Sequence, residues 1–359
     1  MFLRTGSFGF ANFRILLVVL ISAIVVLFFQ MKILTLEESH RKLEQTVERL
    51  IQVNSNIKSS ALSSSLAEQR RNAHPERDMI IIYNRVPKTG STSFVNVAYD
   101  ICKRNMFNVL HLNVTANQHV MSLADQARFV RNLTQWTAKK PGLYHGHVSF
   151  IDFGKFGVTQ KPIYINILRK PLDRLVSYYY FLRYGDNYRP HLLRSRHGDK
   201  MTFDECVKKH HDDCNPDNMW LQIPFLCGHA AECWVHGSNW ALEQAKRNLL
   251  AHYLIVGVTE ELTDFIAILE SALPSFFHGA LQHFQSSNKS HLRRTNQKVE
   301  PSNETVAQIK KSRIWRMENE LYEFALEQFY FLKKRMGVGA DGVVSDKGQQ
   351  FMFEKISPK

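Results

Sequence analysis

The sequence predicts an α/β fold: a doubly wound parallel sheet with flanking helices, preceded by a transmembrane helix and a helical stem. Three observations lead to this expectation. Two segments, 79–94 and 163–178, each run from an apolar stretch through a polar loop into a helical pattern, the order typical of parallel sheets. A long apolar run lies near the N-terminus, and a heptad pattern follows it.

The first of the two segments, MIIIYNRVPKTGSTSF, has the composition of a phosphate-binding loop. Its apolar residues 80–83 suit a strand covered on both faces, and 91–100 resume as a helix whose N-terminal amides face the loop. Gly90 permits close backbone approach, and Lys88 adds a positive charge. The fold is therefore P-loop-like, although Lys88 precedes the glycine, unlike in a Walker A sequence. For this loop alone, an ordinary hydroxyl-rich helix N-cap is the alternative.

The second segment, IYINILRKPLDRLVSY, repeats the order of strand, loop and helix. Arg169 stands at the end of the strand, Pro171 suits the first helical position, and Ser177 lies about two helical turns after Arg169. Ligands of open α/β sheets bind at the carboxyl ends of the strands. We therefore expect the two loops to hold opposite parts of one ligand.

Together the two segments resemble the sulfotransferase family. In that family such a Lys-Thr-Gly loop holds the 5′-phosphosulfate of 3′-phosphoadenylyl sulfate (PAPS), and an arginine and a serine hold its 3′-phosphate. The phrases YHGHVS, RLVSYYYFLRYGD and WLQIPFLCGH are similar to its uronosyl 2-O-sulfotransferase group. The resemblance assigns the donor loop to Lys88, Thr89, Gly90, Ser91, Thr92 and Ser93, and the 3′-phosphate to Arg169 and Ser177.

The N-terminus has the pattern of a signal anchor. Arg4 and Arg14 come first, and the apolar run 15–31 would give about 26 Å of helix, enough for a thin bilayer. The positive flank predicts a cytoplasmic tail over 1–14, with everything after the anchor in the lumen. A cleaved signal peptide is the alternative, but no small-residue cleavage pattern follows Phe29. With the resemblance, this predicts a single-pass type II enzyme of the Golgi membrane.

Residues 32–77 are predicted as a lumenal stem, followed by the sulfotransferase domain over 78–359. The stem begins with a short coiled coil, since apolar residues recur every seven positions, and ends in a Ser-rich flexible linker. The coiled coil favours self-association, and the resemblance favours a homotrimer. The heptad positions are Leu36, Leu43, Leu50 and Ile57.

The charge of the chain suits a polyanionic partner. Lysine and arginine number 46 against 33 aspartate and glutamate, which gives a net charge of +13. Nucleic-acid binders are equally basic, so charge alone does not choose the partner. A lumenal domain does not meet nucleic acid, and the resemblance points to the heparan sulfate chain.

Cysteines in an oxidising lumen are expected to pair. Cys206 and Cys214 are eight residues apart, and Cys227 and Cys233 are six apart, which predicts two local disulfides. Zinc bound with the help of His210, His211 or His229 is the alternative, although no CxxC spacing occurs. Cys102 is left over, and we expect it to be buried.

Two asparagines are candidate glycosylation sites. Asn113 and Asn132 each begin an Asn-X-Ser/Thr sequence. Asn288 and Asn303 do so too, but Asn288 falls in a basic segment that we assign to the site.

Two histidines in LYHGHVSF provide a candidate base. His145 and His147 are two residues apart, so both side chains point to one face of an extended segment. The unperturbed histidine pKa of about 6.5 suits a base near neutral pH. A structural or metal-binding pair is the alternative. The resemblance makes His147 the catalytic base with His145 assisting, gives Lys88 the role of stabilising the leaving nucleotide, and requires no metal.

Basic segments at 183–200 and 288–298 could meet sulfates and carboxylates, although such runs are often only solvated surface. The resemblance places Ser290, Thr295 and Lys298 in a loop that closes on the nucleotide. Aromatic clusters at 178–181 and 315–331 have helical spacing and are predicted as core. The glycan contacts implied by the resemblance are Arg85, Tyr99, His111, Arg189, Arg194 and Lys355.

The predicted activity is transfer of a sulfuryl group from PAPS to the 2-hydroxyl of iduronic acid, and less so of glucuronic acid, in heparan sulfate. A dermatan or chondroitin uronyl 2-O-sulfotransferase is the alternative within the family. A P-loop kinase or NTPase would explain the loop, but no Mg²⁺-binding Ser/Thr follows a Gly-Lys. A non-catalytic heparin-binding protein would explain the charge alone.

Overall fold

Five parallel strands form the centre of the domain in the computed structural model. Their order is β2-β3-β1-β4-β5. The structure describes residues 30–31, 75–114, 118–187, 189–287, 295, 297–339 and 342–345. The strands are β1 (Ile80–Asn84), β2 (Asn108–Leu112), β3 (Gly142–Gly146), β4 (Ile163–Leu168) and β5 (Tyr253–Val258).

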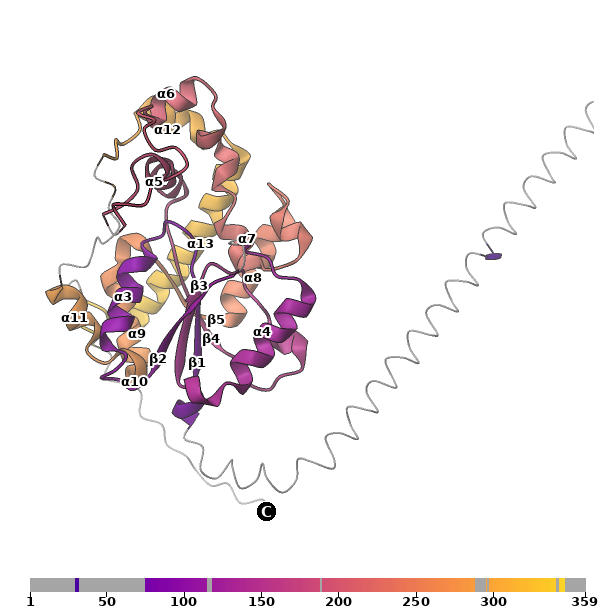
Figure 1. The fold of residues 1–359 in the computed structure, drawn as a ribbon, viewed down its shortest axis with the longest axis vertical. Coiled ribbons are helices and arrows are strands. Elements are labelled where there is room, and N and C mark those ends of the chain that lie inside the picture. Colours follow the sequence, from indigo (N-terminus) through magenta and orange to yellow (C-terminus); the bar gives the residue numbers. More distant parts are fainter. Residues whose placement is uncertain are drawn as a thin grey trace, which may run out of the picture. The chain divides into compact units, whose positions relative to one another are not determined.

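Helices cover both faces of this sheet, as the doubly wound prediction requires (Figure 1). Alternate side chains of β1 enter two separate cores, because successive residues of a strand point to opposite faces. Ile80 and Ile82 pack on the face of α4 (Leu123–Gln135), α7 (Gln222–Cys227) and α8 (Asn239–His252). Ile81 and Tyr83 pack on the opposite face with α3 (Ser91–Ile101), α9 (Leu262–Ala272), α10 (Pro274–Phe277) and α11 (Ala280–Ser286).

The remaining helices complete the domain. The long helix α13 (Arg313–Arg335) packs against β5 and α8, whereas α6 (Phe203–Lys208) packs against α12 (Asn303–Lys310) and α5 (Pro171–Tyr184). Short 3₁₀ turns occur at Pro75–Asp78, Thr137–Lys139, Phe153–Phe156, Asp212–Cys214, Pro216–Met219, Ala231–Trp234 and Thr259–Glu261.

Both strand–loop–helix predictions are confirmed. The first strand runs one residue beyond the predicted 80–83, and its helix begins at Ser91 as expected. Pro171 is the first residue of α5, where its missing N–H costs nothing. Among the described residues, no helix has the length and apolar character needed to cross a membrane. The predicted anchor and stem fall almost wholly outside those residues, as do Ser290 and Lys355.

Both predicted disulfides are present, Cys206–Cys214 and Cys227–Cys233. The zinc alternative for these cysteines is therefore wrong. Cys102 is only half-buried, contrary to the expectation, and its Sγ donates to the carbonyl of Tyr99 at 3.1 Å.

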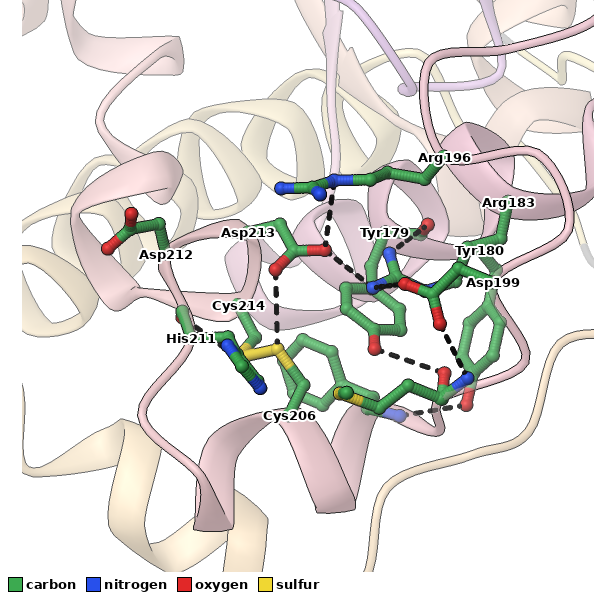
Figure 2. A network of polar contacts seen from close by, with 12 residues as sticks. Tyr179, Tyr180, Arg183, Arg196, Asp199, Cys206, His211, Asp212, Asp213 and Cys214 are labelled. Carbon is green, nitrogen blue, oxygen red and sulfur yellow. Dashed lines mark hydrogen bonds and ion pairs between the residues drawn. A yellow bond between two sulfur atoms is a disulfide. The ribbon is translucent and has the colours of Figure 1, made fainter.

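Arg183 fits neither of the two roles expected for the basic segment 183–200, because it is neither a solvated surface residue nor free to bind a ligand. Its side chain is 1% exposed, and its Nη2 donates to Asp199 at 2.8 Å and to Asp213 at 2.5 Å (Figure 2). The guanidinium also lies 3.5 Å from the ring centroid of Tyr179. A buried charge needs such partners, because leaving it unpaired would cost several kcal/mol. Arg183 therefore anchors the following loop rather than binding a ligand.

A buried polar network joins the last residue of β1, the second half of β4 and the first residue of β5. Asn166 Nδ2 donates to the Asn84 carbonyl at 2.8 Å and to Asn84 Oδ1 at 2.9 Å. The hydroxyl of Tyr253 donates to the same Oδ1 at 3.0 Å, and Asn84 Nδ2 donates to the carbonyl of Phe225 at 3.2 Å. Because these groups are satisfied by one another, they fix the strand ends relative to one another.

We predict that Asn84→Ala lowers the free energy of unfolding by about 1–3 kcal/mol, because it leaves the Tyr253 hydroxyl and the Phe225 carbonyl without their partner. Urea unfolding followed by circular dichroism measures this loss. Asn96→Ala is the matched control, since among the described residues the Asn96 amide bonds only to Thr92 of its own helix, and this variant should cost less than about 0.5 kcal/mol. Equal effects of the two variants would contradict the prediction.

Candidate active site

The loops that follow β1, β4 and β5 meet at one edge of the sheet. The chain leaves β1 towards β2 and β3 but leaves β4 towards β5, so β1 and β4 form a switch point, where open α/β sheets bind ligands. Arg169 Nη1 donates to the carbonyl of Lys88 at 3.3 Å. The hydroxyl of Thr259 lies 2.9 Å from the Thr89 carbonyl and 3.0 Å from the Leu168 carbonyl. The structure therefore brings together the two predicted halves of the donor site.

The loop after β1 has a conformation suited to an anion. Gly90 has φ +74°, a left-handed conformation that favours glycine, and immediately precedes α3. The N-cap residue Gly90 has no side chain to cap the N-terminus of α3, and no acidic residue lies in the first turn of this helix. Such an N-terminus carries partial positive charge, to which Lys88 adds. The hydroxyl of Thr89, by contrast, is buried and donates to the Val86 carbonyl at 3.0 Å, so it shapes the loop.

Arg169 is held by two buried residues that sequence reasoning missed. Its backbone N–H donates to Gln222 Oε1 at 2.9 Å, and Gln222 Nε2 donates to Glu318 Oε2 at 3.2 Å. Glu318 also accepts from the backbone N–H groups of Leu221 and Ile223 at 2.8 and 3.1 Å. Both residues are fully buried, and the only signal in the sequence is a polar residue within an apolar helical pattern.

His145 lies within a cluster of predicted site residues. Its Nε2 is 2.9 Å from the hydroxyl of Tyr99 on α3. His111, its partner in the β2–β3 register, stacks on it with ring centroids 5.0 Å apart. His145 is 3% exposed, and its Nδ1 has no hydrogen-bond partner among the described residues. Two predicted glycan contacts, Tyr99 and His111, thus lie against His145.

His147 has the tautomer that a general base needs. Its Nδ1 lies 2.8 Å from the carbonyl of Arg85, and a carbonyl can only accept, so Nδ1 carries the hydrogen and Nε2 keeps its lone pair. His119 Nδ1 donates to the backbone carbonyl of His147 at 3.1 Å and so fixes the segment from the other side. No motif in the sequence had singled out His119.

Burial and the charge of Arg85 keep these histidines neutral. Desolvation first, and Arg85 second, lower the pKa of His145 and of His147 to about 3. The same two causes lower the pKa of His111. Arg85 therefore acts on all three rings, which places them around one positive charge.

The predicted acceptor residues differ in their surroundings. Arg189 is exposed, and its backbone N–H donates to Asp186 Oδ1 at 2.9 Å. Arg194 is half-buried, and its Nε has no hydrogen-bond partner among the described residues.

In the part of the chain that the structure describes, no group of three His, Cys, Asp or Glu side chains could hold a metal ion.

Ser177, Thr295 and Lys298 are the predicted nucleotide contacts outside the two loops that lie within the described residues. Ser177 is half-buried on α5. The hydroxyl of Thr295 donates to the carbonyl of Gly185 at 3.3 Å, so Thr295 lies beside the end of α5. Lys298 forms an ion pair with Glu300 at 2.7 Å.

The aromatic cluster 178–181 is core only in part. Tyr179 and Tyr180 are buried, but Tyr178 is exposed and Phe181 is half-buried. Phe181 borders the site, because its ring lies beside the side chains of Lys88 and Arg194. The helical spacing did not distinguish these positions.

Known proteins similar to this chain carry sulfotransferase names. Residues 71–325 match the sulfotransferase family. Heparan sulfate 2-O-sulfotransferase 1 of Homo sapiens is 54% identical over 346 residues, which cover 96% of each chain. The protein of that name from Gallus gallus is equally similar. Heparin sulfate O-sulfotransferase of Drosophila melanogaster is 61% identical over 284 residues, 79% of this chain and 80% of that relative.

We predict that His147 stays neutral, with its hydrogen on Nδ1, from about pH 7 down to about pH 5, because its pKa is lowered to about 3. NMR of chains labelled at histidine Cε1 would follow the ring, with the His147→Gln spectrum identifying its signal. A free histidine peptide, with its pKa near 6.5, is the reference. A His147 signal that titrated together with the peptide would contradict the prediction.

Proposed function

Because this chain belongs to the sulfotransferase family, we propose that it transfers a sulfuryl group from PAPS to the 2-hydroxyl of iduronic acid, and less readily of glucuronic acid, in heparan sulfate. One observation carries the reaction type. The neutral His147 donates from Nδ1 to the Arg85 carbonyl and keeps the lone pair of Nε2, at the sheet edge that also carries the donor loop. The names of the similar proteins support the heparan acceptor and the 2-position.

The residues at the switch point fit PAPS as donor. PAPS supplies an activated sulfuryl group on a nucleotide that carries phosphates at both ends of the ribose. The uncapped N-terminus of α3, with Lys88, suits the 5′ end, whereas Arg169 and Ser177 take the 3′-phosphate. Lys88 stabilises the charge that develops on the leaving oxygen. Thr92 and Ser93 in the first turn of α3, together with Ser290, Thr295 and Lys298, complete the nucleotide site.

His147 accepts the proton of the acceptor hydroxyl. A base must be unprotonated before the reaction, and burial with the neighbouring Arg85 charge ensures this for Nε2. His145, held by Tyr99 and His111, assists on the acceptor side. We propose no metal for this reaction.

The acceptor glycan is bound by cations around these histidines. Arg85 lies between the donor loop and the histidines, and Arg189 and Arg194 follow α5 on the loop that Arg183 anchors. Guanidinium groups suit both the carboxylate and the sulfate groups of the chain. The other proposed contacts are Tyr99, His111 and Lys355.

We further propose a single-pass type II enzyme of the Golgi membrane that assembles as a homotrimer. The relatives named for heparan sulfate sulfotransfer support a biosynthetic enzyme of the Golgi type. The proposed parts are the tail 1–14, the anchor 15–31, the stem 32–77 and the lumenal catalytic domain 78–359. Glycosylation at Asn113 and Asn132 agrees with the exposure of both residues.

The acceptor is tested with sulfur-labelled PAPS and chains of desulfated heparan, dermatan and chondroitin. After digestion to disaccharides, we expect label on the 2-position of the uronic acid of heparan. Label only on dermatan or chondroitin would assign the alternative uronyl 2-O-sulfotransferase activity. Absence of label on all three chains would overturn the proposed function.

In the same assay, His147→Ala should lower kcat by about 10²- to 10⁴-fold, since proton transfer to a positioned base contributes on that order. The dissociation constant of adenosine 3′,5′-bisphosphate should stay near that of the unmodified chain, because His147 bonds Arg85 rather than the nucleotide loop. His236→Ala, at an exposed histidine, is the control. Full turnover in His147→Ala would remove the assignment of the base.

Arg169→Ala should abolish the preference for a nucleotide that carries a 3′-phosphate. A charged hydrogen bond contributes about 1.5–3 kcal/mol, so binding of adenosine 3′,5′-bisphosphate should weaken by roughly 10- to 100-fold. Binding of adenosine 5′-monophosphate should change little, which calorimetry can compare. The exposed Arg313→Ala is the matched control. Equal losses for both nucleotides would contradict the role of Arg169.

A further inference from the structure

One aromatic ring lies between the donor loop and the acceptor loop. Phe181 is on α5, four residues after Ser177 and therefore on the same face of the helix. Its ring centroid is 4.1 Å from the ammonium nitrogen of Lys88 and 4.2 Å from the guanidinium carbon of Arg194. These two cations come from segments that are about a hundred residues apart along the chain.

We infer that Phe181 is a positioning residue that holds Lys88 and Arg194 together on its ring. The face of an aromatic ring is negative and attracts a cation within about 6 Å of its centroid, a condition that both side chains meet. The inference rests on the proposed roles of Lys88 towards the donor and of Arg194 towards the glycan. It assigns a function to a residue that touches neither reacting group.

A ring is suited to this task because it leaves the cations charged. A carboxylate in the same place would form an ion pair and compete with the phosphosulfate and the glycan. Among the described residues, Arg194 has no carboxylate within ion-pair distance, and its buried Nε has no hydrogen-bond partner. Its charge is thus oriented by Phe181 and remains available to an anion.

The surroundings hold the ring itself in place. The carbonyl of Phe181 accepts the N–H of Gly185, which ends α5. Arg183, two residues after Phe181, is buried and forms ion pairs with Asp199 and Asp213, which hold this end of the helix (Figure 2). The N–H of Arg196 donates to the Leu182 carbonyl at 3.1 Å, which returns the loop to the helix beside Arg194. Phe181 therefore stands on a fixed support, whereas both cations reach it on long side chains.

A graded series of ring variants tests the inference in the full-length chain. Phenylalanines with one, two and three fluorine atoms at position 181 weaken the negative face while almost keeping the shape of the ring. We expect KM for PAPS and KM for heparan sulfate to rise together with each fluorine. Phe181→Leu, which removes the ring, should raise each by roughly 3- to 10-fold, and Phe181→Tyr should restore both.

Phe324→Leu is the matched control, because Phe324 is a half-buried helical phenylalanine whose ring faces Lys246 at 5.7 Å outside the site. It should leave both KM values unchanged. A purely structural role of Phe181 would give values that do not follow the number of fluorine atoms, and this result would overturn the inference. So would a change in one KM without the other.

Failure of the proposed function gives a different result. If the unmodified chain transferred no sulfate, the proposed function would be ruled out. The role of Phe181 would then be tested by measuring the dissociation constants of the two ligands. Adenosine 3′,5′-bisphosphate and heparan sulfate should then both bind more weakly along the fluorine series, and constant values would overturn the inference.

Discussion

The parallel pairing of β1 with β3 on one side and β4 on the other is the constraint on which the site depends. Because the three strands point the same way, the residues that follow them must meet at one edge. Asn84, the last residue of β1, pairs with Gly146, the last residue of β3. Arg85 and His147, which follow them directly, therefore lie side by side. The buried network of Asn84, Asn166 and Tyr253 keeps that edge aligned.

The same positive charge serves two purposes at this edge. A site for a polyanionic chain needs cations, and a cation beside a buried imidazole disfavours its protonated form. Arg85 lowers the pKa of His111, His145 and His147, after the effect of burial itself. The charge that we propose attracts the glycan therefore also keeps His147, the proposed base, unprotonated. An acidic neighbour, which would raise the histidine pKa, would weaken both properties at once.

Local sequence was sufficient for the parts of the site that depend on local structure. The strand, turn and helix at 79–94 follow from apolar runs, glycine and proline within a few residues, and the structure confirms them. Gln222 and Glu318 were missed because their partners are remote: Gln222 holds a residue 53 positions away, and Glu318 one 96 positions away. The spacing of apolar residues along the sequence does not indicate hydrogen bonds between residues so far apart. The extra signal, a polar residue among apolar ones, does not say which group it satisfies.

The sequence of segment 183–200 does not show which of its arginines stabilise the fold and which can bind a ligand. The side chains that surround Arg183 and Arg194 in the structure do show this. Arg183 faces two carboxylates in a buried setting, so its charge is neutralised and its role is to anchor. Arg194, eleven residues on, faces an aromatic ring, which orients a cation without neutralising it. A guanidinium that is held in place by an aromatic ring keeps its full charge, so it can still pair with an anionic ligand. The distinction depends on which side chains folding brings to each guanidinium, and therefore on the tertiary structure rather than on the run of basic residues.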